Sequence, residues 1–111
     1  MDKLLWASLE ARTKIIKALA HPARLFMVEE LKNGERCVCE LQEMIGYDMS
    51  TVSKHLSVLK NAGIVLDRKE GTSSYYSLKV PCILNFFDCV EEVMESNLRH
   101  DNEIIMACRK R

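Results

Sequence analysis

The fold of this chain is decided by one stretch, Ser50-Thr51-Val52-Ser53-Lys54-His55-Leu56-Ser57-Val58-Leu59-Lys60-Asn61-Ala62-Gly63. At 100° per residue, Val52, Leu56 and Leu59 lie within about 60° of one another, which predicts a helix with one buried stripe. Ser50 is the expected N-cap, and Gly63 is expected to end the helix. The opposite face is polar and carries Ser50, Ser53, Lys54 and Ser57.

The segments before this stretch predict three more helices. Apolar residues recur near helical spacing over 3–19, and His21-Pro22 ends that helix because a residue before proline avoids the helical conformation. Pro22 can open a second helix, which stops at Asn33-Gly34. A short third helix is expected over 38–45, before a turn at 46–48. Two short helices across a tight turn, the second with a polar outer face, predict a helix-turn-helix.

The segments after the stretch predict a hairpin and a long helix. Ile64–Leu66 and Tyr75–Leu78 are β-prone, and the charged residues 67–74 join them as a hairpin tip. Beyond Pro81, an apolar stripe follows one face of a helix to about residue 105. The predicted fold class is therefore mainly α with one β-hairpin, a winged helix-turn-helix in which the hairpin is the wing.

Length and composition set the broad class. The chain has 111 residues, of which 48% are apolar, and it has five cysteines. We expect one domain over 1–111 whose core is small for a monomer, and therefore oligomerisation. Uncharged runs are too short for a membrane span, and the N-terminus lacks a signal peptide's cleavage region, so a cytoplasmic protein is expected. An odd number of cysteines does not indicate a disulfide framework.

The net charge is zero, from 16 basic and 16 acidic residues, but the charges are unevenly distributed. Residues 50–79 hold five basic and two acidic residues, whereas residues 80–98 hold four acidic residues and no basic ones. Phosphate contact needs local cations rather than a high total charge. The balanced total therefore does not exclude nucleic acid as a partner.

Cys37-Val38-Cys39 is the sharpest chemical feature of the sequence. Two neighbouring thiolates favour soft ions such as As(III), Sb(III), Cd(II), Pb(II) or Zn(II). In a regular helix, residues i and i+2 point about 200° apart, so the pair must lie at a helix start or distort that start upon binding. Two sulfurs do not complete a trigonal thiolate site, so a third donor is needed.

Several segments in combination resemble the arsenic-repressor (ArsR/SmtB) family, namely Leu19–Leu25, Gly34–Leu41, Ser50–Gly63, and Arg68–Gly71 with Tyr75–Leu78. The resemblance covers roughly residues 10–95. It implies a homodimeric repressor that binds a palindromic operator in double-stranded DNA, without a cofactor, and leaves it upon binding metal or metalloid. It assigns 37–62 to the helix-turn-helix, 64–79 to the wing, and 1–20 and 81–108 to the dimerisation helices.

On this resemblance, the helix at 50–62 enters the major groove. The DNA-binding residues would be Ser50, Thr51, Ser53, Lys54 and Ser57 on that helix, with Arg68 and Lys69 at the wing tip. The hydroxyls would donate or accept hydrogen bonds, and Lys54 would supply charge. His55 lies beside the buried stripe, where a structural hydrogen bond is favoured over a base contact. Tyr75 and Tyr76 are expected to pack within the wing.

The effector site implied by the resemblance is Cys37 with Cys39, at the start of the third helix. The sequence departs from the family's arsenic pattern, because Gln42 stands where a further cysteine often lies. The third ligand is therefore assigned to Cys82, at a helix start that stabilises a thiolate, with Cys89 or Cys108 as alternatives. No histidine lies near the pair, which favours As(III) or Sb(III) over a four-coordinate Cd, Pb or Zn site.

One other interpretation remains open. The chain could be a repressor of the same fold that responds to reversible cysteine oxidation, at Cys37 and Cys39 or at Cys82 and Cys89. Strain in a disulfide across a single residue disfavours the first pair. An enzyme is not expected, because no cysteine has a base placed beside it by sequence.

Overall fold

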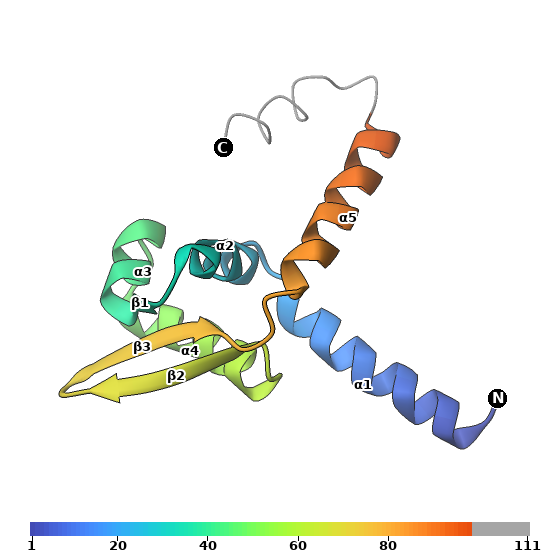
Figure 1. The fold of residues 1–111 in the computed structure, drawn as a ribbon, viewed down its shortest axis with the longest axis horizontal. Coiled ribbons are helices and arrows are strands. Elements are labelled where there is room, and N and C mark those ends of the chain that lie inside the picture. Colours follow the sequence, from blue (N-terminus) through green and yellow to red (C-terminus); the bar gives the residue numbers. More distant parts are fainter. Residues whose placement is uncertain (99–111) are drawn as a thin grey trace. The chain divides into compact units, whose positions relative to one another are not determined.

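The computed structural model describes residues 1–98, which divide into two compact units, with the boundary between Pro81 and Cys82 (Figure 1). The helices of the first unit are α1 (Lys3–Leu19), α2 (Pro22–Glu30) with a 3-10 turn at Leu31–Asn33, α3 (Val38–Ile45) and α4 (Met49–Asn61). Its strands are β1 (Arg36–Cys37), β2 (Val65–Glu70) and β3 (Ser73–Leu78). The described helix of the second unit is α5 (Ile83–Asn97).

Local sequence signals explain where these helices begin and end. The helix α2 begins at Pro22, whose missing N–H costs nothing there, and the His21 ring nitrogen accepts a hydrogen bond from the Ala23 N–H. The helix α3 ends at Gly46, which adopts a left-handed conformation with φ of 83°. The expected bounds of α3 and the start of α2 are therefore confirmed.

The helix α4 corrects one expectation. Its N-cap is Asp48 rather than Ser50, and the helix begins at Met49. The Asp48 carboxylate accepts hydrogen bonds from the Thr51 N–H at 2.7 Å and from the Ser50 hydroxyl at 3.0 Å. A carboxylate in this position accepts hydrogen bonds from free N–H groups and carries the negative charge that a helix N-terminus favours. Asp48 is therefore the N-cap in place of Ser50.

The sheet is larger than the sequence predicts. It has three antiparallel strands in the order β1-β3-β2, with Arg36 opposite Tyr76 and Cys37 opposite Tyr75. The strands of the wing also include most of the charged segment expected as a loop, and the turn is confined to Gly71 and its neighbour. Gly71 has a φ of 62°, which a glycine adopts without strain.

The core of the first unit lies between α2, α3, α4 and the wing. Its largest fully buried side chains are Met27, Val28, Leu41, Val52, Leu56, Leu59 and Val65. The stripe predicted on α4 is therefore confirmed, since all three of its members are buried. This packing fixes α4 against α3, as a helix-turn-helix requires, and leaves its polar face outward.

The two helices expected at a dimer interface carry apolar side chains in the open. In α1 the exposed ones are Leu4, Leu5, Trp6, Ile15 and Ile16, and in α5 they are Phe86, Val90 and Val93. Over residues 1–98, no helix combines the length and the apolar character that crossing a membrane requires. The expected extension of the last helix to residue 108 lies outside the described residues.

Candidate DNA-binding surface and thiol pair

The outer face of α4 presents hydroxyls and one cation. Ser50, Ser53, Lys54 and Ser57 are exposed, and Thr51 is half-buried. The Thr51 and Ser50 hydrogen bonds lower the pKa of the Asp48 carboxyl below its usual value, so the cap is charged at neutral pH. Lys54 forms no ion pair with any residue of the described part, so its ammonium is available to an incoming phosphate.

His55 faces the protein, not the outer face of α4. Its Nδ1 lies 3.2 Å from an Arg24 guanidinium nitrogen on α2, and its ring centroid lies 4.3 Å from that of His21. Tyr47, in the turn before α4, is 6.3 Å away between ring centroids. Burial lowers the pKa of His55, and the neighbouring His21 and Arg24 charges lower it further. His55 therefore makes the structural hydrogen bond that was expected.

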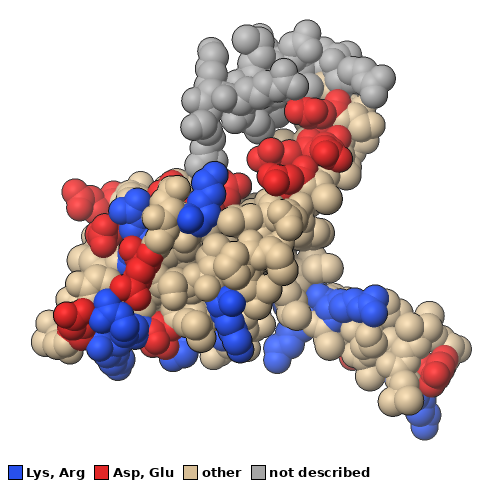
Figure 2. All heavy atoms as spheres, viewed as in Figure 1, with Lys and Arg blue, Asp and Glu red and all other residues tan. Residues whose placement is uncertain are grey.

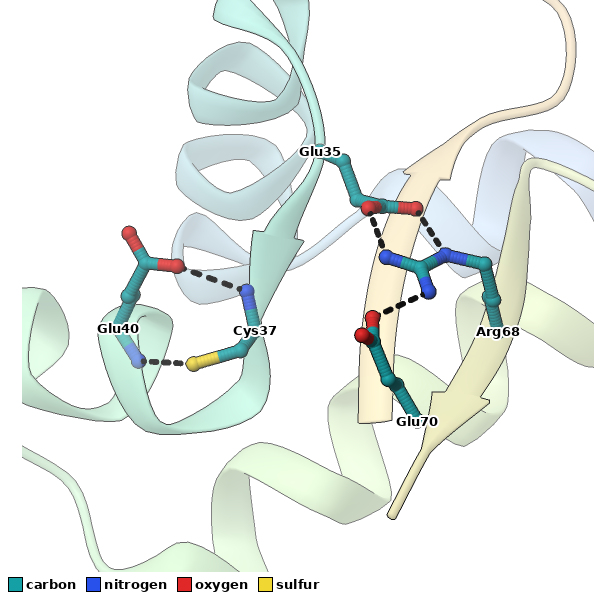
Figure 3. A network of polar contacts seen from close by, with 5 residues as sticks. All are labelled: Glu35, Cys37, Glu40, Arg68 and Glu70. Carbon is teal, nitrogen blue, oxygen red and sulfur yellow. Dashed lines mark hydrogen bonds and ion pairs between the residues drawn. The ribbon is translucent and has the colours of Figure 1, made fainter. Parts of the chain in front are cut away.

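Arg68 on the wing is held by two carboxylates (Figure 3). Its guanidinium donates to both oxygens of Glu35, at 2.7 and 3.2 Å, and to Glu70 at 2.7 Å. It also lies over the Tyr75 ring, 4.8 Å from the centroid. These bonds lower the pKa of Glu35 and raise that of Arg68. In this arrangement Arg68 is already neutralised, whereas Lys69 forms no ion pair within residues 1–98.

A second ion pair joins α4 to the wing. The Lys60 ammonium lies 3.0 Å from an Asp67 carboxylate oxygen on β2. Figure 2 shows basic and acidic atoms intermingled over the end of the hairpin, and a band of acidic atoms along α5. Of the five basic residues in 50–79, Lys60 and Arg68 are therefore compensated within the fold, whereas Lys54, Lys69 and Lys79 form no ion pair within residues 1–98.

Cys37 and Cys39 are joined by a disulfide, with their Cα atoms 5.4 Å apart. The sequence disfavours a disulfide at this pair, and the structure places one there. Cys37 is the N-cap of α3 and has extended backbone angles, φ −80° and ψ 158°, so only Cys39 follows the helical path. The opposed directions of a regular helix therefore do not apply, and the placement of the pair at a helix start is confirmed.

Cys37 also caps the helix that follows it. Its Sγ accepts a hydrogen bond from the Glu40 N–H at 3.4 Å, while the Glu40 carboxylate accepts one from the Cys37 N–H at 3.1 Å (Figure 3). The Cys37 N–H lowers the pKa of Glu40, and an ion pair with Arg36 at 3.2 Å adds to the effect. This reciprocal arrangement is a capping box with the Cys37 sulfur in the serine position. Chemistry at Cys37 Sγ therefore acts directly on the start of α3.

The two other cysteines of the described residues, Cys82 and Cys89, belong to the second unit. Cys82 is the N-cap of α5 without a capping hydrogen bond, and Cys89 lies further along the same helix; both are exposed and free. Cys108 lies outside the described residues. Within residues 1–98, no group of three or more His, Cys, Asp or Glu side chains is placed to hold a metal ion. The assignment of Cys82 as the third ligand stays a prediction.

Sequence reasoning missed Glu35, Glu40 and Asp48, all of which are acidic. Two of them had a readable signal. Glu40 stands three residues after Cys37, the spacing of a capping box, and Asp48 stands three before Thr51. Glu35 had none, because its partner Arg68 is 33 residues away in sequence.

Comparison with known proteins finds a family match over the region that contains the Cys37–Cys39 pair and α4. Residues 21–66 match the family model described as bacterial regulatory protein, arsR family. An uncharacterized HTH-type transcriptional regulator of Methanocaldococcus jannaschii is 36% identical over 85 residues, which cover 76% of this chain and 96% of that protein. A cadmium resistance transcriptional regulatory protein CadC homolog of Staphylococcus aureus is 36% identical, over 82% of this chain and 70% of that protein.

A solved structure extends the similarity to the fold. The solution NMR structure of a homodimeric winged helix-turn-helix DNA-binding domain from Mycobacterium bovis, a possible ArsR-family regulator, matches with a TM-score of 0.76. It is 32% identical and covers 90% of this chain and 93% of its own. The expected winged helix-turn-helix is therefore confirmed.

Proposed function

The chain belongs to the arsR family of bacterial regulatory proteins and is a DNA-binding transcriptional regulator rather than an enzyme, and from this we propose that it is a repressor released from its operator at the Cys37–Cys39 pair. The observation that carries the proposal is the meeting of two sulfurs at the start of α3, the helix directly before α4. A change there acts on the helix that positions the reading helix.

The polar face of α4 is the proposed contact with the major groove. The exposed hydroxyls of Ser50, Ser53 and Ser57 are suited to base edges or phosphates, and Thr51 lies beside them. Lys54 and Lys69 supply charge to the phosphate backbone. Arg68 joins them only after exchanging a carboxylate for a phosphate oxygen, because Glu35 and Glu70 already bind it.

A homodimer is the proposed assembly. Exposed apolar residues on α1, such as Trp6 and Ile16, and on α5, such as Val90 and Val93, provide surface that a monomer would leave in water. A similar structure is homodimeric. A two-fold symmetric dimer places two copies of α4 in successive major grooves, so the operator is proposed to be palindromic.

The proposed effector is As(III) or Sb(III). Binding of arsenite exchanges three hydroxides for three thiolates: each thiol gives up its proton, and three waters leave. Cys37 and Cys39, once reduced, fit as two of the three sulfurs, because they stand at a helix start close enough to bond to each other. The third is proposed to be Cys82, with Cys89 or Cys108 as alternatives, from the same chain or the partner. A soft four-coordinate ion, Cd(II), Pb(II) or Zn(II), would need one more donor.

The proposal is tested by measuring operator affinity in a gel shift with reduced protein, with and without arsenite. We expect binding to a palindromic operator that arsenite weakens, and both responses are required. Cys37→Ser and Cys39→Ser should keep operator binding and lose the arsenite response. A protein that binds no operator, or one whose serine variants still release it with arsenite, contradicts the proposal. Cadmium, lead and zinc in place of arsenite distinguish the ions.

A thiol-disulfide switch is the second candidate, and the Cys37–Cys39 disulfide favours it. Its chemistry needs no third sulfur: peroxide takes two electrons and two protons from the two thiols, one S–S bond forms, and two waters leave. Reduction by a dithiol reverses the step. If peroxide releases the operator, arsenite does not, and a dithiol restores binding, this candidate replaces the first.

A further inference from the structure

The pair formed by Glu35 and Arg68 connects the thiol segment to the wing. Glu35 stands two residues before Cys37, and its two oxygens accept from two nitrogens of one guanidinium, so the contact is bidentate (Figure 3). Bidentate geometry fixes the direction of both planar groups as well as their distance. The orientation of Arg68 therefore depends on where the backbone before Cys37 places Glu35.

The strand pairing also places Cys37 and Arg68 on one line across the sheet. Tyr75 on β3 lies opposite Cys37 on β1 and opposite Arg68 on β2, so the three residues form one line across the sheet. The Arg68 guanidinium lies over the Tyr75 ring. Cys37 is thus at once the cap of α3, a member of the disulfide and a residue of the wing sheet.

We propose that Glu35 is a positioning residue for DNA binding: with the Cys37–Cys39 pair closed, Glu35 holds Arg68 away from DNA, and with the pair open it releases Arg68 to a phosphate. The inference rests on the proposed function, since it describes how closure at the thiols reaches DNA. Closure, by a bond or by a shared ion, restricts the backbone from Cys37 to Cys39. Glu35 then loses less conformational entropy when it binds Arg68, so the ion pair forms more readily.

Glu70 provides the matched control. It also binds Arg68 at 2.7 Å, but it lies on β2, the same strand as Arg68. Unlike Glu35, it is not close to Cys37 in the sequence. E35Q and E70Q remove the same charge from the same guanidinium, so they change general electrostatic attraction to DNA alike. Only E35Q removes the contact that begins at the thiol segment.

The test measures operator affinity by fluorescence anisotropy for fully reduced protein and for the isolated disulfide form. All proteins carry C82S, C89S and C108S, so that only one disulfide can form. An exposed ion pair of this kind changes an equilibrium by roughly two- to fivefold. We expect E35Q to raise the affinity of the disulfide form and to reduce the reduced-to-disulfide affinity ratio two- to fivefold. E70Q should leave that ratio unchanged, and E35D, which keeps the carboxylate, should restore part of it. Equal ratios in E35Q and E70Q overturn the proposal.

A second measurement decides the inference without DNA. Arg68 Nε donates to Glu35, so the NMR signal of its Nε–H, assigned with R68K, reports this bond. We expect reduction of the disulfide to speed the exchange of this proton with water in the wild type and in E70Q, but not in E35Q. An Nε–H exchange rate that is the same in the reduced and the disulfide form of the wild type overturns the proposal. If the exchange responds while operator affinity does not, Glu35 positions Arg68 without effect on DNA binding, and the proposal is overturned. The proposed function is judged separately, by operator binding and arsenite release in the gel shift.

Discussion

Replacing Cys37 by serine or by alanine separates its two roles, capping α3 and binding an effector. Cys37 is 6% exposed, and its Sγ accepts the Glu40 N–H at 3.4 Å. A serine hydroxyl is among the best N-cap groups, so Cys37→Ser keeps this bond, whereas Cys37→Ala leaves the N–H without it. Loss of a cap costs about 1 kcal/mol, within a range of roughly 0.5–2 kcal/mol.

The expected order of stability in reduced protein follows from this geometry. We expect Cys37→Ser to stay within about 0.5 kcal/mol of the wild type, and Cys37→Ala to lose about 1–2 kcal/mol, because it also removes the buried sulfur. The measurement is urea unfolding in excess reductant, at one protein concentration because dimerisation would make stability depend on it. Equal destabilisation of the two variants would refute the claim that Sγ caps α3.

The same two variants address the effector site. Both remove one of the two neighbouring sulfurs, so both should bind arsenite weakly and resist release from the operator. Only the serine variant should bind the operator as the wild type does, since it retains the start of α3. Arsenite release that survives in Cys37→Ser would show that the effector binds elsewhere, whatever the unfolding data show.

Four further predictions concern DNA, pH and the third sulfur. Lys54→Ala should weaken operator binding and reduce the slope of log affinity against log salt by about 1, with unchanged arsenite affinity, as measured by anisotropy titrations. The pKa of His55 is lower in the folded chain than in the unfolded chain, so the unfolded chain takes up this proton first as pH falls. The contribution of His55 to the free energy of unfolding should be full above the ordinary histidine pKa and should decrease as pH falls below it. Urea unfolding at pH 7.5 and pH 5.5 should show a smaller decrease in His55→Asn. Among single serine replacements of Cys82, Cys89 and Cys108, that of Cys82 should reduce arsenite affinity most, as followed by calorimetry. Binding to DNA of unrelated sequence should show a shallow salt slope, because few cations are uncompensated; a steep slope would contradict this count.

The helices could be read from the sequence because each depends on neighbours along the chain. Pro22 and Gly46 mark a start and an end by their own backbone preferences, and the buried stripe of α4 repeats at helical spacing. The start of α4 was misplaced because Asp48 and Ser50, two positions apart, are both good N-cap residues. The competition is settled by the carboxylate, which accepts from both the Thr51 N–H and the Ser50 hydroxyl.

The sheet was harder to predict because its partners are distant in sequence. The strand β1 (Arg36–Cys37) forms only because β3 lies beside it, and Tyr75, the partner of Cys37, is 38 residues further along the chain. The charged residues of β2 indicated a loop, yet Arg68 is held by Glu35 and by the ring of Tyr75 opposite it. Tertiary partners overrode local preference, as they often do in strands.

The zero net charge is consistent with a regulator that must dissociate from DNA. Lys60 and Arg68 are bound to carboxylates of the same fold, so the wing and α4 attract DNA through fewer cations than the sequence count suggests. Sequence-independent attraction, which grows with each neutralised phosphate, is thereby limited. A site whose closure changes operator affinity by a typical allosteric coupling of about 1–3 kcal/mol can then move the balance from bound to free. A strongly basic reading unit would oppose that release with attraction that no change at Cys37 could remove.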